Sequence, residues 1–244
     1  MNTLRDWLRA GPFTLAMSSG FFGFYAHAGF LSVLEAEGLL PARVCGSSAG
    51  ALVAGLWAAG LSTPRICDRF IALRREQFWD VGVGLGVLRG GRFRSLLEAL
   101  LPVRDFNACR VPLAVSVFDV RSWGTAVLRS GAVAPALHAS CAVPVMFQPV
   151  RIDGRLYLDG GILDRPGLAG ASPTDRVLFH HLPRSRGAEP QSRLPDLRVW
   201  PEIRPVVIGD LPRVSPLRLD RGREAIERAA DGLRTALDGP SFTR

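Results

Sequence analysis

The sequence predicts an α/β fold with a central, mostly parallel sheet. Three short apolar runs have the length and composition of buried strands, at residues 13–17, 112–120 and 177–181. Helix-like runs such as 26–36 and 49–59 lie between them, and this alternation is typical of parallel β–α units. The 244 residues suit one domain, and no apolar run is long enough to span a membrane.

The chain opens with a predicted strand–helix–strand unit. The strand 13–17 passes through a glycine-containing turn at 18–23 into the helix 26–36, which has apolar residues along one face. Gly38 is a typical residue for the end of that helix. A short second strand is expected at residues 44–45.

Two helices are predicted next. The run 49–59 is apolar on nearly every side, which indicates a buried helix that ends at Gly60. Thr63 and Pro64 are typical of an N-cap followed by a first-turn proline, and they predict a helix that extends to about Gln77.

The middle of the chain combines a glycine-rich segment with two strands. Residues 81–91 are apolar and rich in glycine but lack the G-x-G-x-x-G spacing of a nucleotide loop, so we expect a mobile apolar loop near a binding site. Strands are predicted at 112–120 and 125–129, and a short helix at 135–141.

The last third of the chain changes character. Residues 151–158 read as two short strands joined by a turn, and they belong to a predicted core that spans residues 10–182. Residues 183–244 begin with a stretch rich in proline and arginine, with one short strand at 206–208 and an amphipathic helix at 219–237. We expect this segment to pack on the same domain.

The composition limits the classes of partner. All thirty basic residues are arginine, and the formal net charge of +8 is compatible with an anionic partner such as a phospholipid surface. The arginines are interleaved with acids along the whole chain, and no nucleic-acid-binding motif accompanies them, so no nucleic acid is expected. The four cysteines are far apart, which predicts reduced thiols and no metal site; no cofactor is expected either.

One short motif indicates covalent chemistry. Gly46-Ser47-Ser48-Ala49-Gly50 has the G-x-S-x-G spacing of a nucleophile elbow, between a predicted strand and a predicted helix. A serine at such a turn exposes its Oγ, and flanking glycines let other backbone approach without a Cβ clash. The following helix directs its N–H groups and positive dipole end at the reaction centre. Ser48 is therefore the candidate nucleophile.

A carboxylate is available as its partner. Asp159 stands at the end of a predicted strand and is followed by Gly160 and Gly161, so it can face an open site as a general base toward Ser48. Taken by itself, Asp-Gly-Gly is better explained as a plain turn.

The turn Ser18–Gly23, between the first strand and the first helix, offers backbone donors. The N–H groups of Ser19, Gly20 and Phe21, together with that of Ala49, can hold an oxyanion. An ordinary strand–helix connection is the alternative interpretation of this turn.

Four blocks in this order resemble the patatin-like phospholipase family over roughly residues 13–170. They are SSGFFG with the helix FYAHAGFLSVLEAEGL, the elbow GSSAGAL, the block ASCAVPVMFQPV, and YLDGGILDRP. The resemblance implies a three-layer α/β/α fold and a lipid acyl hydrolase, of phospholipase A or esterase type. Such an enzyme cleaves carboxylic esters through a Ser–Asp dyad and an acyl-enzyme. By motif, Ser48 matches the nucleophile, Asp159 the aspartate, and Gly20 with its neighbours the oxyanion turn.

The oxyanion turn departs from the common family pattern G-G-G-x-[RK]-G. Ser18 and Ser19 replace two glycines, and Phe22 replaces the basic residue. A Phe-Phe pair favours an apolar acyl chain or a lipid interface over a phosphate contact. Packing of Phe21 and Phe22 in the core is the alternative.

Two other functions stay open at this point. An α/β-hydrolase triad would take its histidine from His180 or His181, which follow Asp159, but only one clear strand precedes Ser48. A catalytically decayed relative that binds lipid or a protein partner is the second. We expect a lipid or small ester as substrate and a cytoplasmic protein, with peripheral contact to a membrane as an open possibility.

Overall fold

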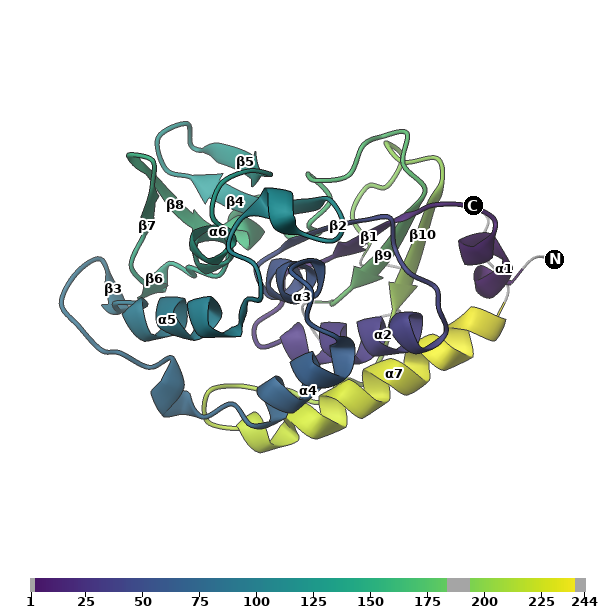
Figure 1. Ribbon diagram of the computed structural model, residues 1–244, viewed down its shortest axis with the longest axis horizontal. Helices are drawn as coiled ribbons and strands as arrows, with labels where there is room; N and C mark the ends of the chain where they lie inside the picture. The colour runs from purple at the N-terminus through teal and green to yellow at the C-terminus, as the bar shows by residue number, and fades with distance from the viewer. Residues whose placement is uncertain (1–2, 184–193, 240–244) are drawn as a thin grey trace.

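The computed structural model describes residues 3–183 and 194–239 (Figure 1). Within these ranges, eight strands form one sheet in the order β10-β9-β1-β2-β4-β8-β7, with β5 paired to β4. The strands are β1 (Thr14–Met17), β2 (Arg43–Ser47), β4 (Leu113–Asp119), β5 (Gly124–Leu128), β7 (Val150–Ile152), β8 (Arg155–Asp159), β9 (Val177–His181) and β10 (Ile203–Val207).

Five consecutive strands of the sheet, β10, β9, β1, β2 and β4, are mutually parallel, whereas β5, β7 and β8 pair antiparallel. Helices flank this sheet, so the predicted α/β fold with a mostly parallel sheet is confirmed. The helices are α1 (Leu4–Arg9), α2 (Phe24–Ala36), α3 (Ala49–Ala58), α4 (Thr63–Ile71), α5 (Gly91–Leu100), α6 (Val133–Ser140) and α7 (Gly222–Asp238).

Both faces of the central strands are buried, so alternate residues along a strand contact two different hydrophobic clusters. Leu15 and Met17 of β1 join the large core under the helices, while Ala16 points to a smaller cluster on the other face. That second cluster includes Leu168 and Leu197, which come from loop segments.

Helix α7 lies along α2 over most of its length (Figure 1). Glycine permits this approach: a Cβ on Gly29 would stand 2.1 Å from the Ile226 carbonyl oxygen. A Cβ on Gly222 would stand 2.3 Å from the ring of Tyr25. The C-terminal helix is therefore built into the core of the described fold.

Two local predictions were wrong. The helix that begins at Thr63 ends at Ile71 instead of about Gln77, and residues 75–77 form a separate 3₁₀ turn. Its N-cap is Ser62, while the backbone N–H and hydroxyl of Thr63 both donate to Glu35, each at 2.6 Å.

The glycine-rich segment 81–91 holds more structure than the predicted loop. It contains strand β3 (Gly86–Leu88), which pairs with β6 (Val145–Phe147) in a separate small sheet, and α5 begins at Gly91. The sequence predicted neither α5 nor β6. The apolar residues Phe93, Leu96, Leu97 and Leu100 do follow the i, i+3, i+4, i+7 spacing of an amphipathic helix, a signal that the sequence analysis passed over.

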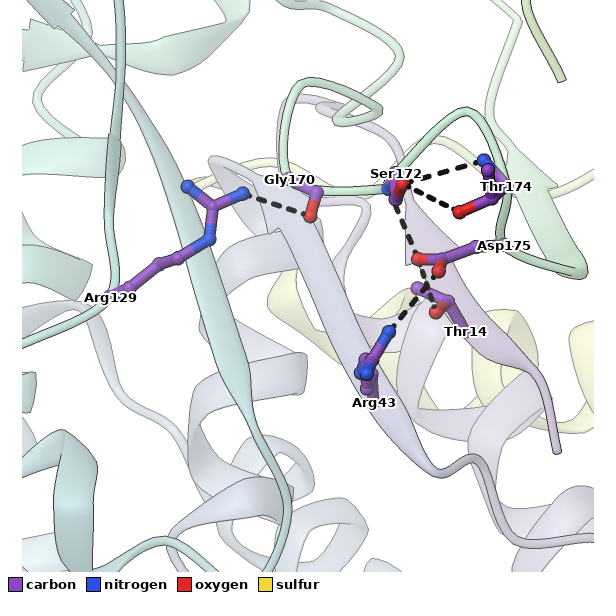
Figure 2. A network of polar contacts seen from close by, with 7 residues as sticks. All are labelled: Thr14, Arg43, Arg129, Gly170, Ser172, Thr174 and Asp175. Atoms are coloured by element: carbon purple, nitrogen blue, oxygen red, sulfur yellow. Dashed lines mark hydrogen bonds and ion pairs between the residues drawn. The ribbon is translucent and has the colours of Figure 1, made fainter.

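The edge of the sheet where the parallel strands begin is closed by a polar network (Figure 2). The Asp175 carboxylate accepts from the Thr14 hydroxyl at 2.9 Å and from the Ser172 N–H at 3.1 Å, and it pairs with Arg43 at 3.2 Å. Arg129 donates to the Gly170 carbonyl at 3.1 Å nearby. These contacts tie the starts of β1 and β2 to the loop before β9.

Candidate active site

Strand register brings Ser48 and Asp159 to the same place. Ser47 of β2 pairs with Ser116 of β4, so Ser48 falls level with Val117. On its other side, Val117 pairs with Asp159 of the antiparallel strand β8. The two residues therefore meet at the carboxyl end of β2, the edge at which open α/β sheets commonly bind ligands.

Ser48 occupies the sharp turn that the elbow pattern predicts. Its backbone has φ 51° and ψ −118°, a sparsely populated conformation, and α3 starts at the next residue. A Cβ on Gly50 would stand 2.1 Å from the Met17 carbonyl oxygen, and one on Gly46 would stand 2.6 Å from Gly50 backbone. Glycine at both flanks lets the elbow close against β1.

Ser48 Oγ donates a hydrogen bond to Asp159 Oδ2 at 2.6 Å. Asp159 Oδ1 accepts the Gly161 N–H at 2.7 Å, which fixes the orientation of the carboxylate. Burial raises the pKa of Asp159 to about 6, although the hydrogen bonds from Ser48 and Gly161 act in the opposite direction. A buried carboxylate with a raised pKa, bonded to a serine hydroxyl, has the arrangement of a general base and its nucleophile.

Close approach also explains the two glycines after Asp159. A Cβ on Gly160 would stand 2.3 Å from the Ser116 carbonyl oxygen. A Cβ on Gly161 would stand 2.4 Å from Ser19 Oγ. The D-G-G segment thus fits between the central sheet and the turn after β1.

A further serine supports the elbow and was missed from the sequence. Ser140, at the end of α6, accepts the Ser48 N–H on its Oγ at 2.8 Å and donates to the Ser116 carbonyl at 2.7 Å. The block around it is one of the four that carry the family resemblance, but the sequence analysis assigned no role to Ser140. The only sequence feature that could have indicated Ser140 was its position near the end of a predicted helix.

The turn Ser18–Gly23 borders the same site, and its backbone N–H groups differ in whether they already have a hydrogen-bond partner. The Ser19 N–H, which was expected as an oxyanion donor, is already engaged, because it donates to the Arg165 carbonyl at 2.8 Å. Gly20 and Phe21 stand beside Ser48 and Ala49 in the lining of one pocket. The N–H of Ala49 opens α3, where a helix leaves its first donors without internal partners.

Ser18 holds this turn in place through three contacts. Its N–H donates to the His180 carbonyl at 3.2 Å, and its Oγ accepts the Leu182 N–H at 2.8 Å. Its carbonyl oxygen lies 2.8 Å from His27 Nε2, which must donate because a carbonyl only accepts.

His27 and His180 are hydrogen-bonded to each other, and neither lines the pocket that contains Ser48. His27 Nδ1 lies 2.9 Å from His180 Nδ1; since His27 donates from Nε2, it accepts here and His180 donates. Burial lowers the pKa of His27 to about 4, which keeps the pair neutral at pH 7. Among the described residues that line the pocket, none is histidine.

The pocket that Ser48 and Asp159 help to line has a volume of about 370 Å³ and a mainly apolar lining. Its walls come from the turn after β1, the elbow and α3, the end of α4, α5, and the segments around 141–147 and 159–162. The aromatic residues of the lining are Phe21, Phe22, Phe24, Phe70, Phe78, Phe93 and Phe147.

The sequence left open whether Phe21 and Phe22 face an apolar ligand or pack in the core. Phe22, at φ 55°, packs on Phe24 and Phe78, with ring centroids 5.5 and 6.0 Å away. Phe21 is exposed and also lines the pocket. Both rings therefore line the pocket, Phe22 while it packs against the core and Phe21 from the surface.

In the ranges 3–183 and 194–239, no three His, Cys, Asp or Glu side chains gather as metal ligands. None of the helices in the same part of the chain is long and apolar enough to cross a membrane.

Comparison with known proteins identifies relatives of this arrangement. An uncharacterised NTE family protein of Mycobacterium tuberculosis is 28% identical over 158 residues, which are 62% of this chain and 42% of that protein. A Caenorhabditis elegans protein named for a patatin-like phospholipase domain is 29% identical over 152 residues, 57% of this chain and 14% of that protein. The chain thus spans less than half the length of either relative.

The fold has a counterpart among solved structures. VipD from Legionella pneumophila superposes with a TM-score of 0.69 at 16% identity, over 93% of this chain and 67% of that one. The family model described as patatin-like phospholipase matches residues 15–171, which include the elbow, Asp159 and the turn after β1. Because this match covers well over half of the chain, the protein belongs to the patatin-like phospholipase family.

Proposed function

We propose that the protein is a lipid acyl hydrolase that cleaves carboxylic ester bonds through Ser48 and Asp159. Family membership supports lipid hydrolysis in general. The observation that carries the finer proposal is the 2.6 Å hydrogen bond from Ser48 Oγ to the buried Asp159 carboxylate, at the floor of an apolar pocket.

The reaction follows from these atoms. Ser48 Oγ attacks the ester carbonyl while its proton passes to Asp159 Oδ2. The N–H groups of Gly20, Phe21 and Ala49 stabilise the negative charge on the carbonyl oxygen. The C–O bond to the alcohol then breaks, and the leaving oxygen takes the proton from Asp159.

Water completes the cycle by attacking the resulting acyl-enzyme. It gives one proton to Asp159 as its oxygen bonds to the acyl carbon. The bond to Ser48 Oγ breaks, Oγ recovers the proton, and the carboxylic acid leaves. No histidine is required in either half of the reaction.

The pocket lining supports an acyl chain as the group bound next to the reacting carbonyl. Its wall is built mainly from Phe and Leu side chains, and the buried Asp159 is the acid among them. An extended hydrocarbon gains from such a lining because each buried methylene contributes about 0.8 kcal/mol.

Ser48→Ala is expected to lower the turnover of p-nitrophenyl esters and phospholipids by about 10³-fold or more, because it removes the nucleophile. Turnover by purified protein is the measurement. Ser47→Ala is the matched control, since the buried Ser47 Oγ has no hydrogen-bond partner among the described residues, and it should keep activity. Full activity in Ser48→Ala, or loss only in a variant with both His180 and His181 replaced, would overturn the proposal. A wild type that is inactive on every ester and is not labelled by a fluorophosphonate would favour a decayed relative.

A further inference from the structure

A group of large apolar side chains is exposed beside the pocket. Val83 and Leu85 keep 96% and 81% of their surface accessible, although monomeric proteins rarely leave contiguous apolar patches bare. We call this group the apolar rim; its members are Val81, Val83, Leu85, Val87 and Val145. Segment 81–88, which supplies four of them, projects at the left end of the molecule in Figure 1.

Ordered contacts hold the apolar rim. The sequence Val81–Leu88 alternates apolar residues with glycines, so no polar side chain interrupts the exposed set. The Gly82 N–H donates to the Val87 carbonyl at 3.0 Å, and Gln148 Nε2 donates to the Val83 carbonyl at 3.0 Å. Pairing of β3 with β6 sets Gly86 beside Val145. The exposed apolar side chains therefore belong to a segment that hydrogen bonds and strand pairing hold in place.

The rim adjoins the mouth of the catalytic pocket. Pro144, the neighbour of Val145, lines that pocket, and so does Met146. The exposed side chains of Phe21 and Ile162 belong to the same lining. A surface that covered the rim would face the opening through which a substrate reaches Ser48.

The charge around the rim has one predominant sign. Residues 69–94 contain six arginines against Glu76 and Asp80, and one of the six, Arg94, pairs with Glu98 at 3.9 Å. The Asp80 carboxylate accepts the N–H groups of Gly90 and Arg92, at 2.9 and 3.1 Å, and is thus engaged at the start of α5. The exposed Arg89 side chain lies against Gly82 within the loop itself.

We propose that the apolar rim and its arginines bind the surface of a membrane that contains anionic phospholipid, with the pocket mouth turned toward the bilayer. Apolar side chains flanked by basic ones are the combination that inserts at the boundary between headgroups and acyl chains. The inference rests on the proposed function, because it states the form in which the lipid substrate meets the pocket.

The test measures binding separately from chemistry. Ser48→Ala protein is sedimented with vesicles of phosphatidylcholine, with and without phosphatidylglycerol, so that binding is scored without hydrolysis. Adding Val83→Glu and Leu85→Glu should weaken binding to the mixed vesicles by about tenfold or more, because two inserted apolar groups become anionic. Binding to phosphatidylcholine alone should be weaker than to the mixed vesicles, and added salt should reduce the difference.

The matched control replaces one leucine and one valine that are exposed elsewhere. Leu40 and Val199, 55% and 54% exposed, lie near the edge of the sheet where the parallel strands begin, away from Ser48. Leu40→Glu with Val199→Glu should leave vesicle binding unchanged. With Ser48 present, Val83→Glu/Leu85→Glu should keep hydrolysis of soluble p-nitrophenyl butyrate and lose hydrolysis of vesicle lipid.

Unchanged vesicle binding by Val83→Glu/Leu85→Glu would overturn the membrane proposal, even if Ser48 proves catalytic. A change in oligomeric state with no change in vesicle binding would overturn it in favour of a contact between copies of the chain. Conversely, rim-dependent binding without any ester hydrolysis would support the membrane surface and contradict the proposed function.

Discussion

Asp159→Asn is expected to lower kcat by about 10²–10⁴-fold while the protein remains folded. The substitution is nearly isosteric and preserves both contacts of the carboxylate. The asparagine carbonyl can accept the Gly161 N–H, and its amide can donate to Ser48 Oγ. Only the ability to accept the Ser48 proton is lost. Steady-state kinetics on a soluble ester, with circular dichroism as the check on folding, measures this effect.

The same group is expected to set the pH dependence of the wild type. Asp159 acts as a base only when ionised, and its pKa is raised to about 6 by burial. We expect kcat/KM to be level above this pH and to fall about tenfold per pH unit below it. A profile that stayed flat down to pH 4 would contradict the role of Asp159 as the base.

Stability should change in the opposite direction to activity. A carboxyl pKa that is raised above its unfolded value of about 3.9 means that the native state holds the proton more tightly than the unfolded chain. The free energy of unfolding therefore falls as pH rises between about 4 and 6, and the full cost persists above that window. Asp159→Asn removes this cost, so the variant should be more stable at pH 7 by about 1–3 kcal/mol. Urea unfolding of both proteins at pH 4 and pH 7 tests the sign.

Gly29→Ala is expected to destabilise the protein by about 2–3 kcal/mol. The added Cβ would stand 2.1 Å from the Ile226 carbonyl oxygen, and backbone cannot yield as a side-chain end can. Helices α2 and α7 would have to separate, although alanine is the better helix former by about 1 kcal/mol. The midpoint of urea unfolding is the measurement.

Gly209→Ala is the matched control for this effect. Nothing lies within 4 Å of a Cβ built at Gly209, so its midpoint should shift little. A Gly29→Ala variant as stable as the wild type would contradict the close packing of α7 on α2, whereas equal losses in both variants would indicate a general cost of replacing glycine.

The parts of the site that could be predicted are those that a local pattern specifies. The spacing of Gly46, Ser48 and Gly50 describes a turn whose geometry depends on those residues, and the structure has that turn. Asp159 follows a strand and precedes two glycines, and the structure brings it to Ser48. The apolar runs likewise predicted the central strands, because their burial on both faces is visible in composition alone.

What the sequence left out depends on contacts between distant segments. Ser140 contacts Ser48 across 92 positions of sequence, and His27 contacts the turn Ser18–Gly23 through the Ser18 carbonyl. The short helix α1 did carry a usable signal, the capping pair Thr3 and Asp6, which sequence reasoning passed over. The Ser19 N–H bond to Arg165 could not be read from any local pattern, since it joins separate loops.

The central claim is that Ser48, activated by Asp159, forms a covalent bond to the substrate carbon. Peptide mass spectrometry after reaction with a fluorophosphonate tests it most directly, because the reagent bonds to an activated serine oxygen. We predict an adduct on the peptide that contains Ser48, absent in Ser48→Ala and formed about 10²-fold more slowly in Asp159→Asn. An unlabelled wild type, or a label carried by a different residue, would contradict the account.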